Sequence, residues 1–273
     1  MIFGRLVSVL FLLTAALHAG SADRVKIDVG GMFATSFETD MQLSKKGFPI
    51  GGKINTKDQL GMDSDTASFR IGGHYRFSDS HGTECSYYGV RSDSHKTVDR
   101  ELEWNGDLIE ARAMVDSYLD MDVFKINYAY SFYHSDRVEL ALGAGLHITS
   151  IRLGLTAQGK INGVEKQNTS ESSSVTAPLP IVGFGGEYAI IPERLFARYQ
   201  ANYFYLAPSD YKGALISNTM ALEYGLMGHV RAGFGFDSDV IVVEMDDGEK
   251  KVEVETGFPV SCSIFRSYTD KMI

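Results

Sequence analysis

The residues best suited to chemistry lie in one short stretch, where His147 is followed by Thr149 and Ser150. A histidine beside hydroxyl groups activates a nucleophile when a carboxylate orients its imidazole ring. The candidate carboxylates are Asp210, Asp237 and Asp239. These residues do not follow the spacing of a known catalytic motif, so the alternative interpretation is a histidine that makes hydrogen bonds inside a barrel. We therefore expect no catalytic residue, no metal ligand and no cofactor.

Two alternating segments position this stretch. In residues 125–132, KINYAYSF, large apolar side chains such as Ile126 and Tyr128 alternate with small or polar ones, and residues 138–147, VELALGAGLH, repeat the pattern. Successive side chains of a strand point to opposite faces, so each segment predicts a strand whose two faces meet different environments. The polar segment YHSD between them predicts the turn of a β-hairpin.

The same alternation recurs along the chain. Strands are predicted at residues 25–37, 67–77, 83–91, 114–132, 137–155, 175–190, 195–206, 214–226, 230–245 and 251–265. A change of phase in the fourth segment predicts a β-bulge near Val123. The fold class that follows is all-β, a closed antiparallel transmembrane β-barrel of about ten strands.

The connections alternate in length. Long polar connections are predicted at residues 38–66, 92–113 and 156–174, and short ones at residues 78–82, 133–136, 191–194 and 227–229. The pair Asp247-Gly248 predicts the turn of the last hairpin. Long loops at one end and short turns at the other are typical of barrels in the outer membrane of Gram-negative bacteria.

The N-terminal segment has the layout of a secretory signal peptide. One positive charge precedes an apolar stretch from Leu6 to Leu17, and small residues follow it. We expect residues 1–22 to be cleaved and residues 23–273 to form the barrel domain. The net charge is −9, and lysine and arginine are scattered over the 273 residues, so no basic patch predicts binding to nucleic acid.

Alternation alone does not tell which face of the barrel meets water, because a soluble barrel of the lipocalin kind has the same period and an apolar interior. Two features favour the membrane interpretation. The polar face is rich in glycine, including Gly143, Gly183 and Gly235, which suits a narrow lumen. The apolar face carries aromatic residues near the strand ends, as the girdles of membrane barrels do. Its aromatic residues are Phe33, Phe37, Phe69, Tyr75, Phe77, Tyr128, Tyr130, Phe132, Tyr203, Tyr205 and Tyr224.

The order of strands and turns in APLPIVGFGGEYAI (177–190), PERLFARYQANYFYL (192–206) and YKGALISNTMALEYGLMGHVRAGFGF (211–236) resembles small bacterial outer-membrane barrels of the OmpA-transmembrane and OmpW-like kind. The resemblance covers most of the mature chain. It implies a bacterial outer-membrane location, insertion by the barrel-assembly machinery, and contact with outer-membrane lipids and lipopolysaccharide.

The alternation also assigns charged side chains to the lumen. The predicted network consists of Arg70, His74, Arg76, Glu84, Lys125, Glu139, His147, Glu187, Arg198, Glu223 and Arg231, and we expect Glu253 and Glu255 to point inward as well. Charges withdrawn from bulk water persist when they are paired, so ion pairs that close the lumen are one interpretation. The other is a narrow pore with a titrating histidine.

These features predict a structural or surface-interaction role for the barrel, with extracellular ligands reached through the long loops. A narrow channel for small solutes is the alternative, and a lipid-modifying hydrolase at the rim is a third. The two cysteines, Cys85 and Cys262, are both expected on the lipid face, in the third and tenth strands. Three inter-strand steps separate them by about 14 Å, which is too far for a disulfide, so we expect two free thiols.

Overall fold

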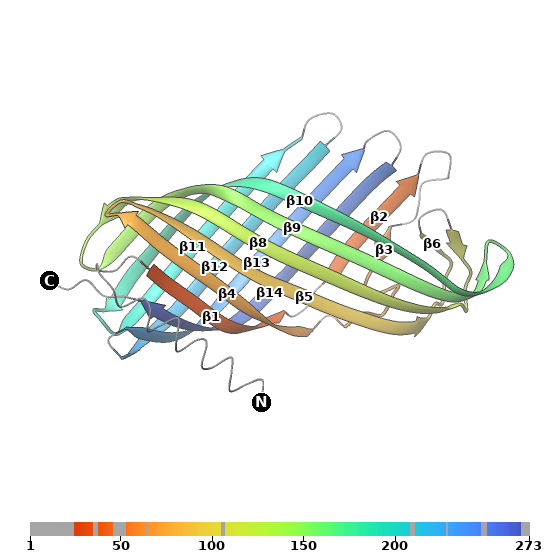
Figure 1. The fold of residues 1–273 in the computed structure, drawn as a ribbon, viewed down its shortest axis with the longest axis horizontal. Helices are drawn as coiled ribbons and strands as arrows, with labels where there is room; N and C mark the ends of the chain where they lie inside the picture. Colours follow the sequence, from red (N-terminus) through yellow and green to blue (C-terminus); the bar gives the residue numbers. More distant parts are fainter. Residues whose placement is uncertain are drawn as a thin grey trace.

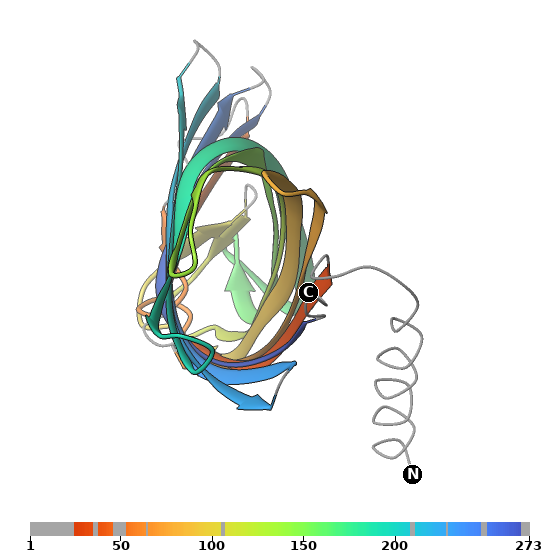
Figure 2. The same cartoon turned by 90° about the vertical axis from the view of Figure 1, so that its left-hand side faces the viewer.

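The computed structural model describes residues 25–34, 38–45, 53–63, 65–104, 107–207, 211–227, 229–246 and 250–268. Ten of the fourteen strands in these residues form one closed ring, in which each strand is antiparallel to the next (Figure 1). They are β1 (Val25–Ala34), β4 (Thr66–Ser78), β5 (His81–Thr97), β8 (Met114–His134), β9 (Val138–Ile161), β10 (Val164–Ile191), β11 (Leu195–Leu206), β12 (Tyr211–Met227), β13 (Val230–Asp246) and β14 (Lys250–Tyr268). Because β1 also pairs with β14, the ten strands form a closed ring, as the view along it shows (Figure 2). The predicted closed barrel of ten antiparallel strands is confirmed.

The strands are tilted against the barrel axis. The ladder of paired residues that starts at Val25 of β1 and passes through Tyr75 of β4 reaches β14 at Gly257. The closing pair places Lys26 of β1 opposite Tyr268, at the other end of β14. Such an offset is what a tilted barrel requires, and Figure 1 shows the oblique strands. Residues at one height in the lumen therefore come from shifted positions in successive strands.

The long connections contain more strand than the sequence indicated. Residues 156–174, predicted as a loop, are the ends of β9 and β10, which stay paired up to a turn at Asn162 and Gly163 with φ of 53° and 78°. The other two long connections contain β2 (Glu38–Lys45), β3 (Ile54–Asn55), β6 (Leu102–Trp104) and β7 (Asp107–Ile109). In the β10 arm, the threonine and serines of residues 169–174 lie on both faces, so this arm lacks the alternation by which strands are recognised. The Asp247-Gly248 turn lies outside the described residues.

The environments of the two strand faces change places along β8. Nearest the short turns, Lys125 and Asn127 face inward and Ile126 and Tyr128 face outward. Farther along the same strand, the inward positions are apolar and the outward ones acidic. The inward residues there are Val115, Leu119, Met121 and Val123, and the outward ones are Asp116, Asp120 and Asp122.

The bulge predicted near Val123 is therefore wrong. The pairing of β8 with β5 and β9 runs unbroken through this residue, and the irregularity in the ladder falls between Ser131 and Tyr133. The change of phase instead marks the height at which the outer face leaves hydrocarbon for water. Below it the barrel is apolar outside and polar inside, and above it the reverse holds, as in a soluble protein.

An apolar core fills the projecting half of the barrel. Its wall residues include Val90, Leu119 and Leu153, and the segments between the barrel strands add Met41, Ile54, Leu60 and Trp104, which is 2% exposed. A second cluster joins β10, β12 and β13 through Leu179, Leu215 and Ile241. This half of the barrel thus has the apolar interior of a lipocalin-like barrel, and the other half has the apolar outer face of a membrane barrel. In the described part of the chain, no helix is both long and apolar enough to cross a bilayer.

The same exchange of faces explains two errors on β14. Glu253 and Glu255 were expected inside, but they lie on the outer face, where Lys53 contacts Glu255 at 3.1 Å. Cys262 was expected on the lipid face, but it is buried inside beside Ile264. On the projecting part of a strand the polar face is the outer one. Assigning its polar residues to the lumen therefore exchanges the inward and outward positions of the whole strand. The prediction of two free thiols is confirmed, and Cys85 does face outward.

Candidate functional site in the lumen

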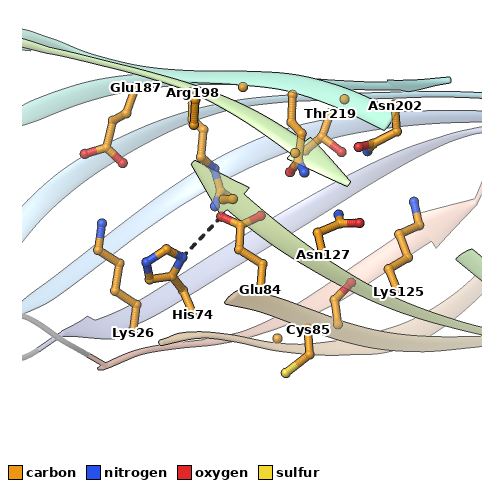
Figure 3. Close-up of a pocket in the computed structure, with 18 of the residues that line it drawn as sticks. Lys26, His74, Glu84, Cys85, Lys125, Asn127, Glu187, Arg198, Asn202 and Thr219 are labelled. Carbon is orange, nitrogen blue, oxygen red and sulfur yellow. Dashed lines mark ion pairs between the residues drawn. The ribbon is translucent and has the colours of Figure 1, made fainter. Parts of the chain in front are cut away.

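A polar cavity of about 140 Å³ lies within the membrane half of the barrel. One wall consists of glycines of β9 and β10, including Gly143, Gly183 and Gly185, which leave the space open. Charged side chains enter it from the other strands, and Figure 3 shows Lys26, His74 and Glu84 projecting toward Glu187 and Arg198 across it. The cavity thus has charges of both signs around a shared polar interior.

The layer nearest the short turns is centred on Arg266 of β14. Its Nε lies 2.5 Å from Asp28 Oδ1, and its Nη1 lies 3.1 Å from Glu223 Oε2. Arg231 Nη1 donates a hydrogen bond to Glu187 Oε1 at 3.0 Å. Glu223 is 1% exposed and receives its cations from three strands, so removal of one arginine leaves part of its charge compensated.

Two further ion pairs continue this layer around the wall. His74 Nδ1 lies 3.4 Å from Glu84 Oε1, and Arg76 is paired with Glu139. Arg198 Nη2 lies 3.7 Å from Glu223, which links the pairs of β11 to the arginines of β13 and β14. Each carboxylate of this layer has a basic partner, as the desolvation of charges in a narrow lumen requires.

A second layer closes the cavity toward the projecting half. Lys125 Nζ lies 3.0 and 3.2 Å from the two carboxylate oxygens of Asp239 and donates to Ser217 Oγ at 3.1 Å. The Tyr88 hydroxyl donates to Asp239 Oδ2 at 2.5 Å. Beside this group, Arg70 Nη1 donates to Asp237 Oδ2 at 2.6 Å, and Thr219 contacts the other oxygen of Asp237. The apolar core begins directly above these residues.

The structure does not assemble the candidate catalytic group. His147 is fully buried, and neither ring nitrogen has a hydrogen-bond partner within the described residues. Ser150 points outward, where its hydroxyl lies 2.7 Å from Thr176 Oγ1. The two described carboxylates, Asp237 and Asp239, are held by Arg70 and Lys125, and Asp210 lies outside the described residues. His147 and Thr149 share the inner face of β9, with no carboxylate hydrogen-bonded to the imidazole among the described groups.

The structure places all eleven predicted network residues on inward positions of their strands. Ten take part in the ion pairs described above, and His147 lies next to Lys125 in the register of β8 and β9. The sequence analysis missed Arg266 and did not place Asp237 or Asp239 in the lumen. For Arg266 a signal existed, because it has the same parity as Cys262 on β14, and an arginine on the lipid face to which Cys262 was assigned would be destabilising.

The outer surface just above the membrane band is also charged. Arg91 Nη2 donates to Asp122 Oδ1 at 2.6 Å, and Tyr87 donates to the same oxygen at 2.7 Å. Partial burial raises the pKa of the Asp122 carboxyl, but these two hydrogen bonds outweigh it and hold that pKa below its ordinary value. Asp120 lies 3.4 Å from Arg91 and 3.9 Å from Arg152. This charged strip indicates where the outer faces of β5, β8 and β9 meet water.

Comparison with known proteins supports the architecture. The barrel is similar to the outer membrane protease OmpT from Escherichia coli, with a TM-score of 0.56 and 11% sequence identity over 92% of this chain and 99% of that one. It is also similar to the outer membrane protein OprG from Pseudomonas aeruginosa, with a TM-score of 0.38 and 12% identity over 91% and 97% of the two chains. For the attachment invasion locus protein Ail of Yersinia pestis, the TM-score is 0.34 and the identity 12% over 90% and 99%. No curated protein matches this chain.

At 11% identity, the likeness to OmpT shows the fold alone. The family model of the outer membrane protein beta-barrel domain, in contrast, matches residues 6–226, which is most of the chain. The closed ring of ten strands, the outward apolar band and the paired charges of the lumen fit that family. The chain therefore belongs to the outer membrane protein beta-barrel family and is located in the bacterial outer membrane.

Proposed function

We propose that this protein is a closed, non-conducting barrel with a structural or surface-interaction role. The carrying observation is that two different barriers lie in series along its axis. Ion-pair layers cross the membrane half, and an apolar core that includes Trp104 and Leu60 fills the projecting half. An apolar core excludes ions even when the polar layers rearrange, so the closed state does not depend on any one ion pair.

The projecting strands supply the surface for interaction. The paired ends of β9 and β10, and the short strands β2, β3, β6 and β7, lie on the side of the long connections. We propose that extracellular ligands bind there, that outer-membrane lipids and lipopolysaccharide contact the apolar band, and that the barrel-assembly machinery inserts the chain after cleavage of residues 1–22. The mixed charges of the strip around Arg91 and Asp122 suit contact with polar molecules outside the membrane.

Conductance in planar lipid bilayers tests the closed state. We expect no stable openings for the wild-type barrel, and none for Lys125→Ala, because the apolar core still blocks the path. Openings are expected only when Lys125→Ala is combined with Leu119→Ser and Met121→Ser, which make the core polar. The core changes alone serve as the matched control. Stable openings of the wild-type protein would contradict the proposal.

A narrow channel for small solutes is the second candidate, and the cavity of about 140 Å³ with its glycine wall favours it. In that case the charges at Arg70 and Glu139 line the path that solutes take. Stable wild-type openings that Arg70→Ala or Glu139→Ala abolishes would establish this alternative.

A hydrolase at the rim has the least support. The contact of Lys125 with Ser217 at 3.1 Å is the nearest arrangement to a nucleophile and base, but Lys125 also donates to both oxygens of Asp239. An ammonium group has no lone pair with which to accept a proton from serine. Loss of a lipid-modifying activity in a His147→Ala protein would support an enzyme.

A further inference from the structure

The outer surface of the barrel has an apolar groove across β9 to β13. It is an open groove of about 550 Å³, within the size range of small-molecule sites, and eleven of its lining residues lie at outward positions of their strands. Its walls are large apolar side chains, among them Leu140, Tyr188, Tyr199, Leu222 and Phe234. Because these side chains belong to the membrane band, the medium that fills the groove is hydrocarbon.

Two small residues form the floor of the groove. Gly186 lies between Leu140 of β9 and Tyr199 of β11, and Ala197 lies between Tyr188 of β10 and Leu222 of β12. Large neighbours around a glycine and an alanine leave a depression in the outer surface. An acyl chain that packs into it makes dispersion contacts that an empty depression would lack.

The groove runs toward the end of the barrel with the short turns. Val138, at the first position of β9, and Tyr188, near the end of β10, both line it. Short turns mark the periplasmic side of an outer-membrane barrel. The groove therefore lies in the periplasmic leaflet, which places phosphate groups next to those turns.

Two arginines lie in the turns at this end. Arg137 precedes β9, and its carbonyl accepts a hydrogen bond from Ala189 of β10 at 2.8 Å; Arg194 precedes β11, and its carbonyl accepts one from Gly225 of β12 at 2.8 Å. Both arginines are exposed, and neither forms an ion pair with the described residues. Arg137 lies at the β9 edge of the groove and Arg194 between β10 and β11, so two guanidinium groups lie beside its periplasmic end. Asp136 and Glu193, which the structure also describes, adjoin them in the chain but form no ion pair with them.

The geometry points to a binding site for one phospholipid of the periplasmic leaflet, with an acyl chain in the groove and the phosphate at Arg137 and Arg194. The inference rests on the membrane location of the barrel and holds whether or not the lumen conducts. Guanidinium groups bind phosphate oxygens through paired hydrogen bonds, and apolar burial of the chain supplies the remaining affinity.

Native mass spectrometry of the full-length barrel, purified in mild detergent and titrated with phosphatidylglycerol, tests this site. The wild-type barrel is expected to retain one lipid. Arg137→Ala and Arg194→Ala each weaken retention by about fivefold, as expected for one basic residue at a membrane surface. Ala197→Trp fills the floor of the groove and removes binding. The matched control is Ala144→Trp, which changes an alanine on the lipid face of β9 outside the groove and leaves binding unchanged.

The two arginine variants are in exposed turns, so they test the site even where a tryptophan in the wall disturbs folding. Equal retention by the wild type and both arginine variants overturns the proposal, as does an equal loss in the two tryptophan variants. A wild-type dimer that Ala197→Trp converts to a monomer also overturns it, because the groove is then an interface between two copies.

Discussion

Removal of the Asp239 carboxylate should leave a buried cation inside the barrel without its counter-ion. In Asp239→Ala, the ammonium of Lys125 loses both of its contacts to carboxylate oxygens, and the Tyr88 hydroxyl loses its acceptor. Asp239 is 1% exposed, and its Lys125 partner is also buried. Breaking a buried ion pair from one side costs about 3–5 kcal/mol, so we expect the free energy of unfolding to fall by that amount.

The double variant Lys125→Met with Asp239→Leu is the control. It removes both charges and fills the layer with apolar groups, and such replacements are often neutral or stabilising. We therefore expect its stability to lie within about 1 kcal/mol of the wild type. With the single variants Lys125→Met and Asp239→Leu the cycle is complete, and its coupling energy isolates the ion pair from the change of side-chain volume.

Guanidinium chloride unfolding of the barrel in phospholipid vesicles measures these differences. Trp104 is the protein's one tryptophan and is buried in the projecting core, so its fluorescence reports the loss of that core. Unfolded barrels also migrate differently from folded ones on gels run without heating. A loss below about 1 kcal/mol in Asp239→Ala would refute the reasoning, since it would mean that water already solvates Lys125.

Three other predictions concern the exchange of faces along the strands. Ile126→Arg puts an arginine on the lipid face and should lower the folding stability in vesicles by about 2–4 kcal/mol. Ser172→Arg, on the outer face of the projecting part of β10, should lower it by less than about 0.5 kcal/mol. Equal effects would mean that the membrane band does not lie where we place it. Met121→Ala should destabilise the barrel by about 2–5 kcal/mol because it leaves a cavity in the core. Leu142→Ala should cost under about 1 kcal/mol because lipid fills the space on the outer face. Unfolding curves of the two variants measure this difference. The pKa of Asp122 is lowered in the folded barrel, so the wild type should be more stable than Asp122→Asn above about pH 4. This difference in stability should disappear as the pH falls through the folded-state pKa. Unfolding at several pH values measures it, and a difference that grows in acid would contradict the prediction.

The local pattern was sufficient for the barrel strands and their number. Residues 195–206 were predicted as a strand and are β11, and residues 114–132 fall within β8. Alternation with period two is a property of neighbouring residues, so one chain segment contains it. The end of β10 was missed because serine and threonine occupy both of its faces, and there pairing with β9 keeps the chain extended.

The partners within the lumen could not be predicted in this way. Arg266 meets Asp28 and Glu223 because closure of the ring brings the two ends of the chain together, and tilt sets the heights at which their side chains meet. An ion pair such as Arg70 with Asp237 joins β4 to β13, which no local pattern connects.

By itself, the sequence determined a ring of alternating strands, because each strand reports the contrast between its own two faces. It did not determine which face is wet at a given height. In β14, Glu253 faces outward and Arg266 inward, although both are polar, because the outer medium changes from water to hydrocarbon between them. Only the tertiary structure assigns a height to each residue, through the tilt and the closing pair of strands, and so only it decides that one half of the barrel has a polar lumen and the other a dry core.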